Sequence, residues 1–381
     1  MTIDATILIA VLSLLIGIAA GFVMHRSDYC VTGMFRDAVM FGDTFMLRSL
    51  CLQIVATMLL FEVLRRVGLL PLYPFPLLDK PSLATLAGGF LFGIGMVLAG
   101  GCVVGTLYKL GAGSVTSLAA LFGLILGSGL YAEIHLQWSG FAKATTLSET
   151  LTIPQMLRLD PAVLIIAVAL PAALLFHRWR RRHAWERETV ASGYLQPWKA
   201  GLILAVLGAI SYVNVAMPLG ISTTYAKLAA MLATLVVPAH VESLAFFKAE
   251  PLHAFHATTG LLLSGGPGPH PDSIWAIQMP LIVGIVGGST LSATILGEFA
   301  IRFKVPAIQL LTALTGGTLM GLASRMAPGC NVWHLMGGLP IFAWQSILFT
   351  IGLLPGTWIG GKILFRLLTN TNPLFSCRRC R

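Results

Sequence analysis

Residues 88–102 read GGFLFGIGMVLAGGC, and residues 316–330 read GGTLMGLASRMAPGC. The two stretches share seven identical positions, including the glycine pair at the start and the Gly-Cys pair at the end. Both are largely apolar over most of the length that a membrane-spanning helix needs. A segment repeated in this way within one chain predicts a protein built from two similar membrane-embedded halves.

The composition of the whole chain fits this prediction. Charged residues make up 10% of the 381 residues, and hydrophobic residues make up 56%. Soluble domains carry about 25% charged residues, so a soluble core of this size would lack the polar surface to cover it. The figures exclude a cytosolic enzyme, a disordered chain, a disulfide scaffold and a coiled coil. The net charge of +10 belongs to no basic soluble module, so nucleic-acid binding is not expected.

Charge-free stretches predict about nine transmembrane helices. They cover residues 5–24, 44–64, 81–108, 110–132, 161–176, 200–226, 273–297, 305–324 and 326–361. Glycine or proline interrupts several of them, which predicts additional short re-entrant segments or half-helices. The expected fold class is therefore an all-α polytopic membrane protein.

Basic residues set the expected orientation. If the N-terminus lies outside and the spans alternate, about two thirds of the 25 Lys and Arg residues lie on the cytoplasmic side, as the positive-inside rule requires. We therefore expect a multi-pass protein of the inner, cytoplasmic membrane with a cytoplasmic C-terminus. The expected parts are a first membrane half (1–177), a basic cytoplasmic linker (178–199), a second membrane half (200–370) and a basic cytoplasmic tail (371–381).

In this topology the two repeated stretches cross the membrane in opposite directions. Antiparallel repeats are typical of transporters whose substrate path lies near the midplane, at the interface of the halves. The glycine spacing in each copy also suits close helix packing, and we expect both interpretations to hold. Packing does not explain the Gly-Cys pair that ends each copy. Gly101, Cys102, Gly329 and Cys330 are therefore predicted to line the path.

Cationic residues near the cysteines predict an anionic substrate. Cys30 lies in HRSDYCVTGMFRD, residues 25–37, a polar insertion expected to form a pore mouth, and Arg26 lies close to it. Arg325 precedes Cys330 by five residues and falls on the outside, where the orientation rule gives no reason for a cation. Cations within a membrane are costly and usually functional where they face a cavity.

Other cysteines and a group of histidines have different interpretations. Cys51 is expected to be a small buried residue, as lone cysteines in apolar helices usually are. Cys377 and Cys380 have Cys-x-x-Cys spacing, for which a solvated tail is favoured over a redox or metal role. A metal permease is a weaker alternative that would use His240, His253, His256 and His270, which lack acidic partners in the sequence.

A membrane thiol enzyme is the main alternative to a transporter. A sulfurtransferase or thiol oxidoreductase would use Cys30, Cys102 or Cys330 covalently and would need an activating base beside the thiol. His25 and His334 are the candidates by spacing. The internal repeat favours transport, because catalysis does not require one. We expect no catalytic residue, no metal and no cofactor.

The chain resembles the YeeE/YedE family of membrane proteins, which transport thiosulfate and related sulfur compounds. The resemblance rests on motifs along almost the whole chain: HRSDYCVTGMFRDAV (25–39), GGFLFGIGMVLAGGCVVGTLYKLGAGS (88–114), PLGISTTYAKL (218–228) and GGTLMGLASRMAPGCNVWHLMGG (316–338). It implies an hourglass-shaped bundle with two pseudo-two-fold halves. It also implies uptake of thiosulfate into the cytoplasm along Cys30, Cys102 and Cys330.

Three details bear on this resemblance. At the position where the first half carries the Cys30 motif, the second half carries PLGIST, which contains no cysteine. This agrees with the family, which has three such cysteines rather than four. Asn331 continues the Gly-Cys-Asn motif of the family, and the bulky Trp333 departs from it. The partners implied are thiosulfate and the lipid bilayer. A cytoplasmic sulfur-carrier protein that docks on the basic linker stays open as a further partner.

The chemistry of thiols suits such a path. Thiosulfate is a dianion with a terminal sulfur, and a neutral thiol donates only a weak S–H hydrogen bond. Conduction requires sites that admit an ion and then release it. Spaced thiols with cations only at the mouths would meet this requirement, whereas fixed arginines inside a dry pore would trap a dianion.

Overall fold

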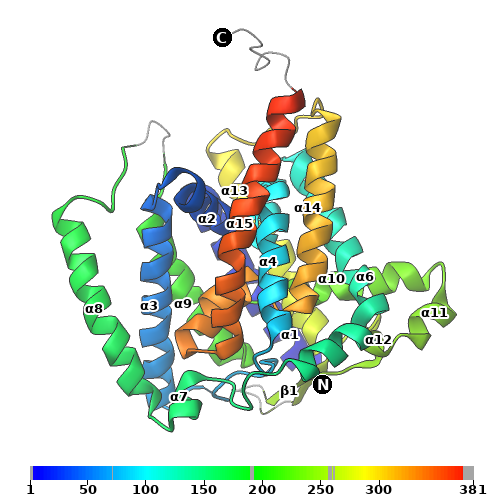
Figure 1. The fold of residues 1–381 in the computed structure, drawn as a ribbon, viewed down its shortest axis with the longest axis horizontal. Coiled ribbons are helices and arrows are strands. Elements are labelled where there is room, and N and C mark those ends of the chain that lie inside the picture. Colours follow the sequence, from blue (N-terminus) through cyan, green and yellow to red (C-terminus); the bar gives the residue numbers. More distant parts are fainter. Residues whose placement is uncertain (1–2, 71, 189–192, 256–259, 261, 372–381) are drawn as a thin grey trace.

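The fold is described from a computed structural model of the chain. It describes residues 3–70, 72–188, 193–255, 260 and 262–371. Within these ranges, nine helical segments are long and apolar enough to cross a membrane. The long helices are α1 (Ile3–Ser27), α3 (Phe45–Arg66), α4 (Leu83–Leu98), α6 (Val115–Ala144), α8 (Pro161–Arg181), α9 (Pro197–Val215), α13 (Ser273–Ile295), α14 (Ala307–Met326) and α15 (Trp344–Thr371). They form one upright bundle with α4 between α14 and α15 (Figure 1).

Short helices interrupt this bundle, as the glycines and prolines in the sequence predict. They are α2 (Val31–Phe41), α5 (Val103–Gly111), α10 (Ser222–Thr234) and a π-helix (Trp333–Gly338) that runs into a 3₁₀ turn (Leu339–Ile341). One of the predicted spans therefore contains a break, and two others are too long. The stretch 81–108 breaks at Cys102, the stretch 200–226 ends its first helix at Val215, and the stretch 326–361 contains two helices. Hydropathy continues across these breaks because the short helices are also apolar.

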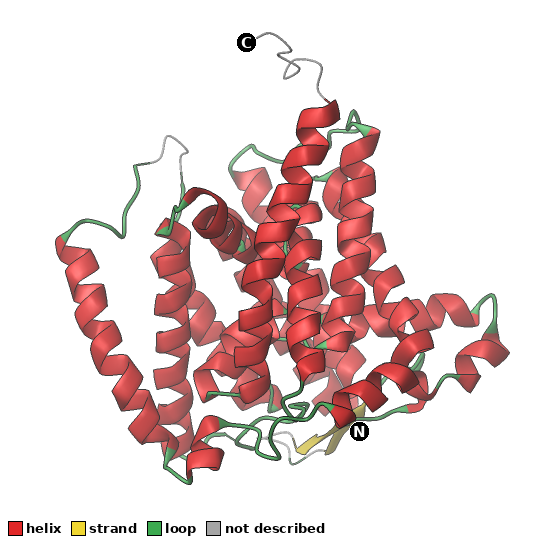
Figure 2. Cartoon of the chain, in the orientation of Figure 1, coloured by secondary structure: helices red, strands yellow, loops and turns green. Residues whose placement is uncertain are grey.

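Small elements cover one end of the bundle. They are α7 (Ile153–Leu157), α11 (Pro238–Ser243), α12 (Ala245–Lys248) and an antiparallel pair of strands, β1 (Leu252–Phe255) and β2 (Leu262–Gly265), with Leu252 opposite Gly265. The strands lie at the lower end of the view in Figure 2. We call this end of the bundle the outer end, after the predicted orientation. The opposite end, where α15 finishes, is the inner end.

A buried ion pair joins α10 to the loop after β2. Lys227 is fully buried, and its Nζ lies 2.7 Å from Asp272 Oδ2. The same Nζ donates hydrogen bonds to the carbonyl oxygens of Gly268 at 2.9 Å and His270 at 2.7 Å. A buried cation with three oxygen partners is fully compensated. The loop at the outer end is therefore fixed to a helix of the core.

Helices of the first half pack on helices of the second half in matching pairs. Helix α1 packs on α13, and α9 packs on α3. Helix α6 packs on α14, and α15 packs on α4. Among the short helices, α2 contacts α15, and α10 contacts α6. The core is therefore shared between the halves, and neither half is closed without the other.

The repeated glycines lie at the closest of these contacts. Helices α4 and α14 are in close contact at two places. A Cβ added at Gly88 would meet Ala327, and a Cβ added at Gly316 would meet Ala99. Ala99 and Ala327 occupy the same position in the two repeated stretches. The next glycines of each copy face the backbone of another helix, α15 for Gly89 and α6 for Gly317. The predicted role of the glycine spacing in packing is confirmed.

These contacts predict a specific cost for an added methyl group. Gly317→Ala places a Cβ against the backbone of α6, and overpacking of this kind costs about 1–3 kcal/mol. We expect a lower melting temperature for the variant in detergent. Gly287→Ala on α13 is the control, because no atom lies within 4 Å of the added Cβ and alanine is the better helix former by about 1 kcal/mol. Equal melting temperatures for the two variants would contradict this packing argument.

Candidate functional site

Four short helices begin at buried positions in the centre of the bundle. The residue just before each helix is Cys30 for α2, Cys102 for α5, Ile221 for α10 and Cys330 for the helical segment 331–338. None of the four is more than 5% exposed. The first N–H groups of a helix have no partner within it and attract negative charge. Three thiols and one aliphatic side chain thus occupy equivalent places at the starts of these helices.

Cys30 and Cys102 form a close pair of thiols. Both side chains lie against Gly105, and Cys102 Sγ accepts a hydrogen bond from the Gly105 N–H at 3.3 Å. A Cβ added at Gly105 would lie 2.9 Å from Cys30 Sγ and 3.3 Å from Cys102 Sγ. Glycine at this position therefore leaves the room that the two sulfur atoms occupy.

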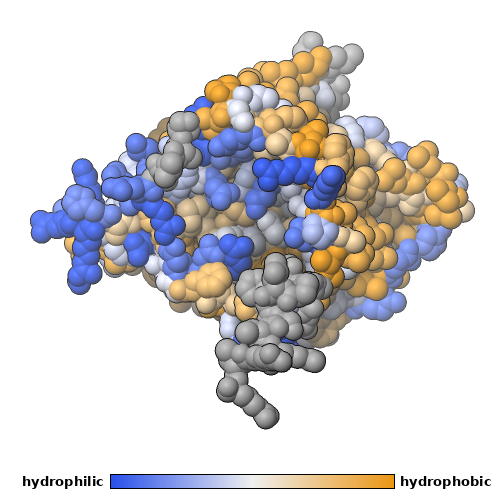
Figure 3. Space-filling model, turned by 90° about the horizontal axis from the view of Figure 1, so that it is seen from above, coloured by the Kyte–Doolittle hydropathy of each residue, from blue (hydrophilic) through white to orange (hydrophobic). Residues whose placement is uncertain are grey.

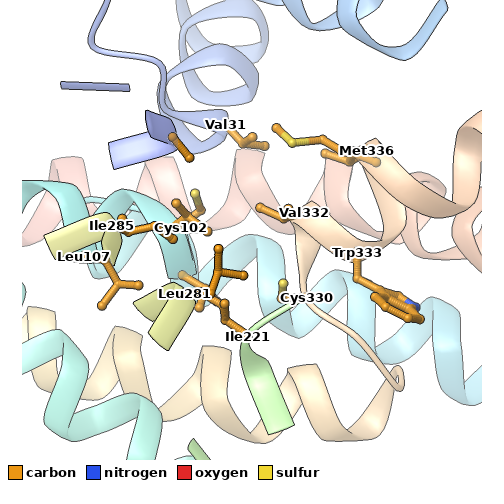
Figure 4. Packing of buried hydrophobic residues seen from close by; sticks show 14 of the residues in the cluster. Val31, Cys102, Leu107, Ile221, Leu281, Ile285, Cys330, Val332, Trp333 and Met336 are labelled. Carbon is orange, nitrogen blue, oxygen red and sulfur yellow. The ribbon is translucent and has the colours of Figure 1, made fainter. Parts of the chain in front are cut away.

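Cys330 lies in the same buried cluster, with apolar side chains around it. Figure 4 shows Cys102 and Cys330 among Ile221, Leu281 and Val332. The cavity lined by these three apolar residues is about 20 Å³, which is room for roughly one water molecule. The middle of the bundle is therefore closed in this conformation, with larger cavities on both sides of it.

The outer cavity has a volume of about 230 Å³ and contains Arg325. The Arg325 guanidinium donates hydrogen bonds to Thr223 Oγ1 at 3.2 Å and to Ser222 Oγ. Within the described ranges it forms no salt bridge. Trp333 also lines this cavity, and its ring packs edge-on against Phe75 with 4.9 Å between centroids. An arginine with hydroxyl partners only keeps its positive charge available to an anion.

The inner cavity has a volume of about 590 Å³ and is more polar. Arg26 lines it and donates to the Gly193 carbonyl at 3.0 Å. Tyr108 donates to Asp28 Oδ1 at 2.7 Å at the base of the cavity, close in sequence to both members of the thiol pair. Figure 3 shows hydrophilic side chains gathered across much of this end.

The structure places the predicted residues in three groups. Cys30, Cys102 and Cys330 come together in the core, whereas Arg26 and Arg325 lie in cavities at opposite ends. The predicted path thus has its cations at the two mouths and its thiols between them.

The other predicted residues shape the turns around the cysteines. Gly329 has φ +143°, a conformation that L side chains rarely adopt. Gly101 packs against the start of α5, with Thr106 N 3.3 Å from an added Cβ. Asn331 is fully buried, and neither its amide nitrogen nor its amide oxygen has a hydrogen-bond partner in the described part of the chain. Buried polar groups left in this state are rare and suit a binding site.

Several residues of the two cavities are missing from the sequence prediction. Ser222 and Thr223 belong to the motif PLGISTTYAKL, which the sequence analysis uses only because it lacks a cysteine. The two adjacent hydroxyl residues in this motif are the sequence feature that could have indicated hydrogen-bond partners for an arginine. Asp28 enters the sequence analysis only as part of a polar insertion.

The expectation that Cys51 is buried is wrong, because its place on α3 is exposed. A small thiol on the outer face of a membrane helix contacts lipid at little cost.

The histidines proposed as bases are engaged elsewhere. His334 Nε2 lies 2.7 Å from the Ala327 carbonyl, and its Nδ1 lies 3.0 Å from Ser346 Oγ. His25 Nδ1 lies 3.0 Å from Ser292 Oγ. A general base must be within hydrogen-bond reach of its nucleophile, so this geometry does not favour a thiol enzyme.

The residues proposed for metal binding are not gathered into a site among those that can be described. His240 Nε2 lies 2.8 Å from Glu133 Oε1 in a solvent-exposed pair. No group of three or more metal-ligating side chains occurs within the ranges given above. His256, Cys377 and Cys380 lie outside those ranges.

Comparison with known proteins identifies the family. The model of a family described as sulphur transport matches residues 26–359. Thiosulfate transporter TsuA of Spirochaeta thermophila is 30% identical over 375 residues, 93% of this chain and 98% of the relative. TsuA of Escherichia coli is 26% identical over 352 residues, 92% of this chain and 94% of the relative. The probable transporter YedE of Escherichia coli is 31% identical over 133 residues, 35% of this chain and 31% of the relative.

These relatives are named as transporters and not as enzymes. The matched range contains Cys30, Cys102 and Cys330 as well as Arg26 and Arg325. The chain therefore belongs to the sulphur transport family, which confirms its resemblance to the YeeE/YedE membrane proteins.

Proposed function

We propose that this protein takes up thiosulfate across the cytoplasmic membrane and passes the ion along Cys330, Cys102 and Cys30. The observation that carries the proposal is the burial of three thiols in one core, together with a cavity toward each end of the bundle that contains an arginine. Two relatives that align over nearly their whole length are named thiosulfate transporters, which supports the choice of ion.

The distribution of charge supports transit of the ion rather than trapping. Arg325 attracts a dianion to the outer cavity, and Arg26 faces the inner one. Between them the thiols are neutral, weak donors that contact the terminal sulfur. Helix N–H groups add partial positive charge without a full charge. Weak successive sites of this kind allow entry and release. Gly101, Gly329 and Asn331 shape the turns that present Cys102 and Cys330.

The matching helix pairs support an inverted repeat. Exchange of α1 with α9, α3 with α13, α4 with α14 and α6 with α15 converts each major contact into another observed contact. We therefore assign residues 1–177 and 200–370 to two halves related by a pseudo-two-fold axis between α4 and α14. The cavities at both ends of a closed centre support the hourglass shape implied by the family.

Ion pairing supports the proposed orientation. At the outer end, Arg65 and Arg66 pair with Glu62 and Asp160 at 2.8–3.0 Å, and Lys80 pairs with Glu149. These cations are neutralised by their carboxylate partners, so they add little net positive charge to the side that we propose is outside. We therefore place the N-terminus outside and the C-terminus, residues 371–381, in the cytoplasm of the cell.

The basic linker, residues 178–199, is attached to the inner end of the bundle. Arg48 donates to the Ala184 carbonyl at 3.1 Å, and Arg187 pairs with Asp43 at 2.8 Å. The Phe45 N–H and then the Arg187 guanidinium hold the pKa of Asp43 below its ordinary value, because both stabilise the ionised carboxylate. A cytoplasmic sulfur-carrier protein would meet this basic surface beside the exit of the path.

Substitution of the cysteines tests the path. Cys102→Ala and Cys330→Ala should each lower uptake of labelled thiosulfate into proteoliposomes by about fivefold, because loss of one hydrogen bond costs about 1 kcal/mol. The serine variants keep a donor but lose the soft sulfur and should fall in between. Cys51→Ala, on an exposed face of α3, should match the wild type. Uptake by both alanine variants at the wild-type rate would contradict the thiol path.

Substitution of Arg325 tests the outer mouth. Arg325→Ala should raise the KM for thiosulfate several-fold, because the outer cavity loses its positive charge. Lys143→Ala is the matched control: Lys143 is an exposed cation near the end of α6 that lines neither of the two cavities. The readout is the concentration dependence of thiosulfate uptake in liposomes of one composition. If both variants raise the KM equally, Arg325 acts only as a surface charge.

Reporter fusions test the orientation. A reporter joined after Arg381 should be active in the cytoplasm, and one inserted near Pro267, in the loop after β2, should be active only outside. Cytoplasmic activity at Pro267 would break the antiparallel arrangement of the repeats, since it would require one span fewer or more in the chain before it.

A further inference from the structure

Tyr225 on α10 has a buried hydroxyl group without a hydrogen-bond partner. The side chain is 1% exposed, and no partner for its Oη occurs in the described part of the chain. The other tyrosines that are at most 2% exposed are all satisfied. Tyr29 donates to Gln53 Oε1 at 2.7 Å, Tyr108 donates to Asp28 at 2.7 Å, and Tyr212 donates to a backbone carbonyl at 2.6 Å. A buried hydroxyl left unpaired is destabilising unless something else binds it.

The hydroxyl lies beside the part of the path between two thiols. Tyr225 follows Ile221 by one helical turn, and both residues belong to the same buried cluster as Cys102 and Cys330. Asn331, directly after Cys330, is fully buried, and its amide nitrogen and oxygen also have no hydrogen-bond partner in the described part of the chain. Ile221 and Val332, the neighbours of these two residues along the chain, line the small apolar cavity in the middle of the bundle. The two buried polar side chains therefore belong to the segments that border this cavity.

The two ends of thiosulfate have different chemistry. The terminal sulfur matches a thiol, but the three sulfonate oxygens require O–H or N–H donors when they leave water. An aliphatic constriction with thiols alone would leave these oxygens unsatisfied. A tyrosine hydroxyl is protonated at neutral pH, since its ordinary pKa is about 10, so it donates a hydrogen bond without adding a charge that would hold the dianion.

On the basis of the proposed function, we propose that Tyr225 is an oxyanion-binding residue of the path. Its hydroxyl donates a hydrogen bond to a sulfonate oxygen while the terminal sulfur passes from Cys330 to Cys102. The thiols thus select for the sulfur end of the ion, and Tyr225 stabilises the oxygen end at the constriction.

The test compares Tyr225→Phe with Tyr212→Phe in the full-length protein. Both tyrosines are buried and both variants lose only a hydroxyl, but Tyr212 has a structural partner and Tyr225 has none. Tyr225→Phe should lower the maximal rate of thiosulfate uptake about tenfold, as expected for loss of a hydrogen bond to a charged group. Its KM should stay within about twofold, because the outer cavity is unchanged, and its melting temperature should not fall. Tyr212→Phe should lower the melting temperature and keep the rate per folded molecule.

Two results would overturn the inference. One is a maximal rate for Tyr225→Phe equal to that of the wild type. The other is a fall in melting temperature with a proportional loss of folded protein, as for Tyr212→Phe, which would make the hydroxyl structural. The cysteine variants separate this failure from failure of the proposed function. If Cys102→Ala and Cys330→Ala lose uptake while Tyr225→Phe keeps it, the thiol path stands and only the role of the tyrosine is wrong.

Discussion

The close contact between α4 and α14 is the constraint on which the site depends. These helices can touch only because glycines face the partner at Gly88 and Gly316. Each helix ends ten residues after this glycine and is followed by a Gly-Cys turn, and Cys102 and Cys330 both belong to one buried core. The flanking glycines fix α15 and α6 around this pair. The positions of two thiols thus follow directly from the packing of two backbones.

The proposed anion path through such a core faces opposing demands. A dianion in a medium of low polarity needs donors, but a fixed cation beside it would bind too tightly for release. The molecule separates the two demands in space. Arg26 and Arg325 lie in cavities at the ends, and the side chains that we propose for the centre, the thiols, Tyr225 and Asn331, are neutral donors. The proposal requires a rearrangement each time an ion passes, because the cavity beside Ile221, Leu281 and Val332 has a volume of only about 20 Å³.

Much of this could be predicted from the sequence, and the remainder has physical reasons. Hydropathy predicts nine spans because burial in lipid requires long apolar segments, and the repeat identifies Cys102 and Cys330. Hydropathy could not locate the break at Cys102, because α5 is itself apolar. It could not place Ile221 at the start of a fourth short helix, nor show that the Tyr225 hydroxyl has no partner among the described residues, since both depend on contacts between distant segments. The exposure of Cys51 depends on which face of α3 meets lipid.

The central claim is that the thiols pass the ion intact, without breaking its sulfur–sulfur bond. The most direct measurement uses thiosulfate with different isotopes in its two sulfur atoms and purified protein in liposomes that contain no thiol acceptor. Both labels should appear inside in equal amounts, on one molecule, with none on the protein. Separation of the two labels, with the terminal sulfur bound to Cys30, Cys102 or Cys330, would contradict the account and establish a sulfur-transfer reaction instead.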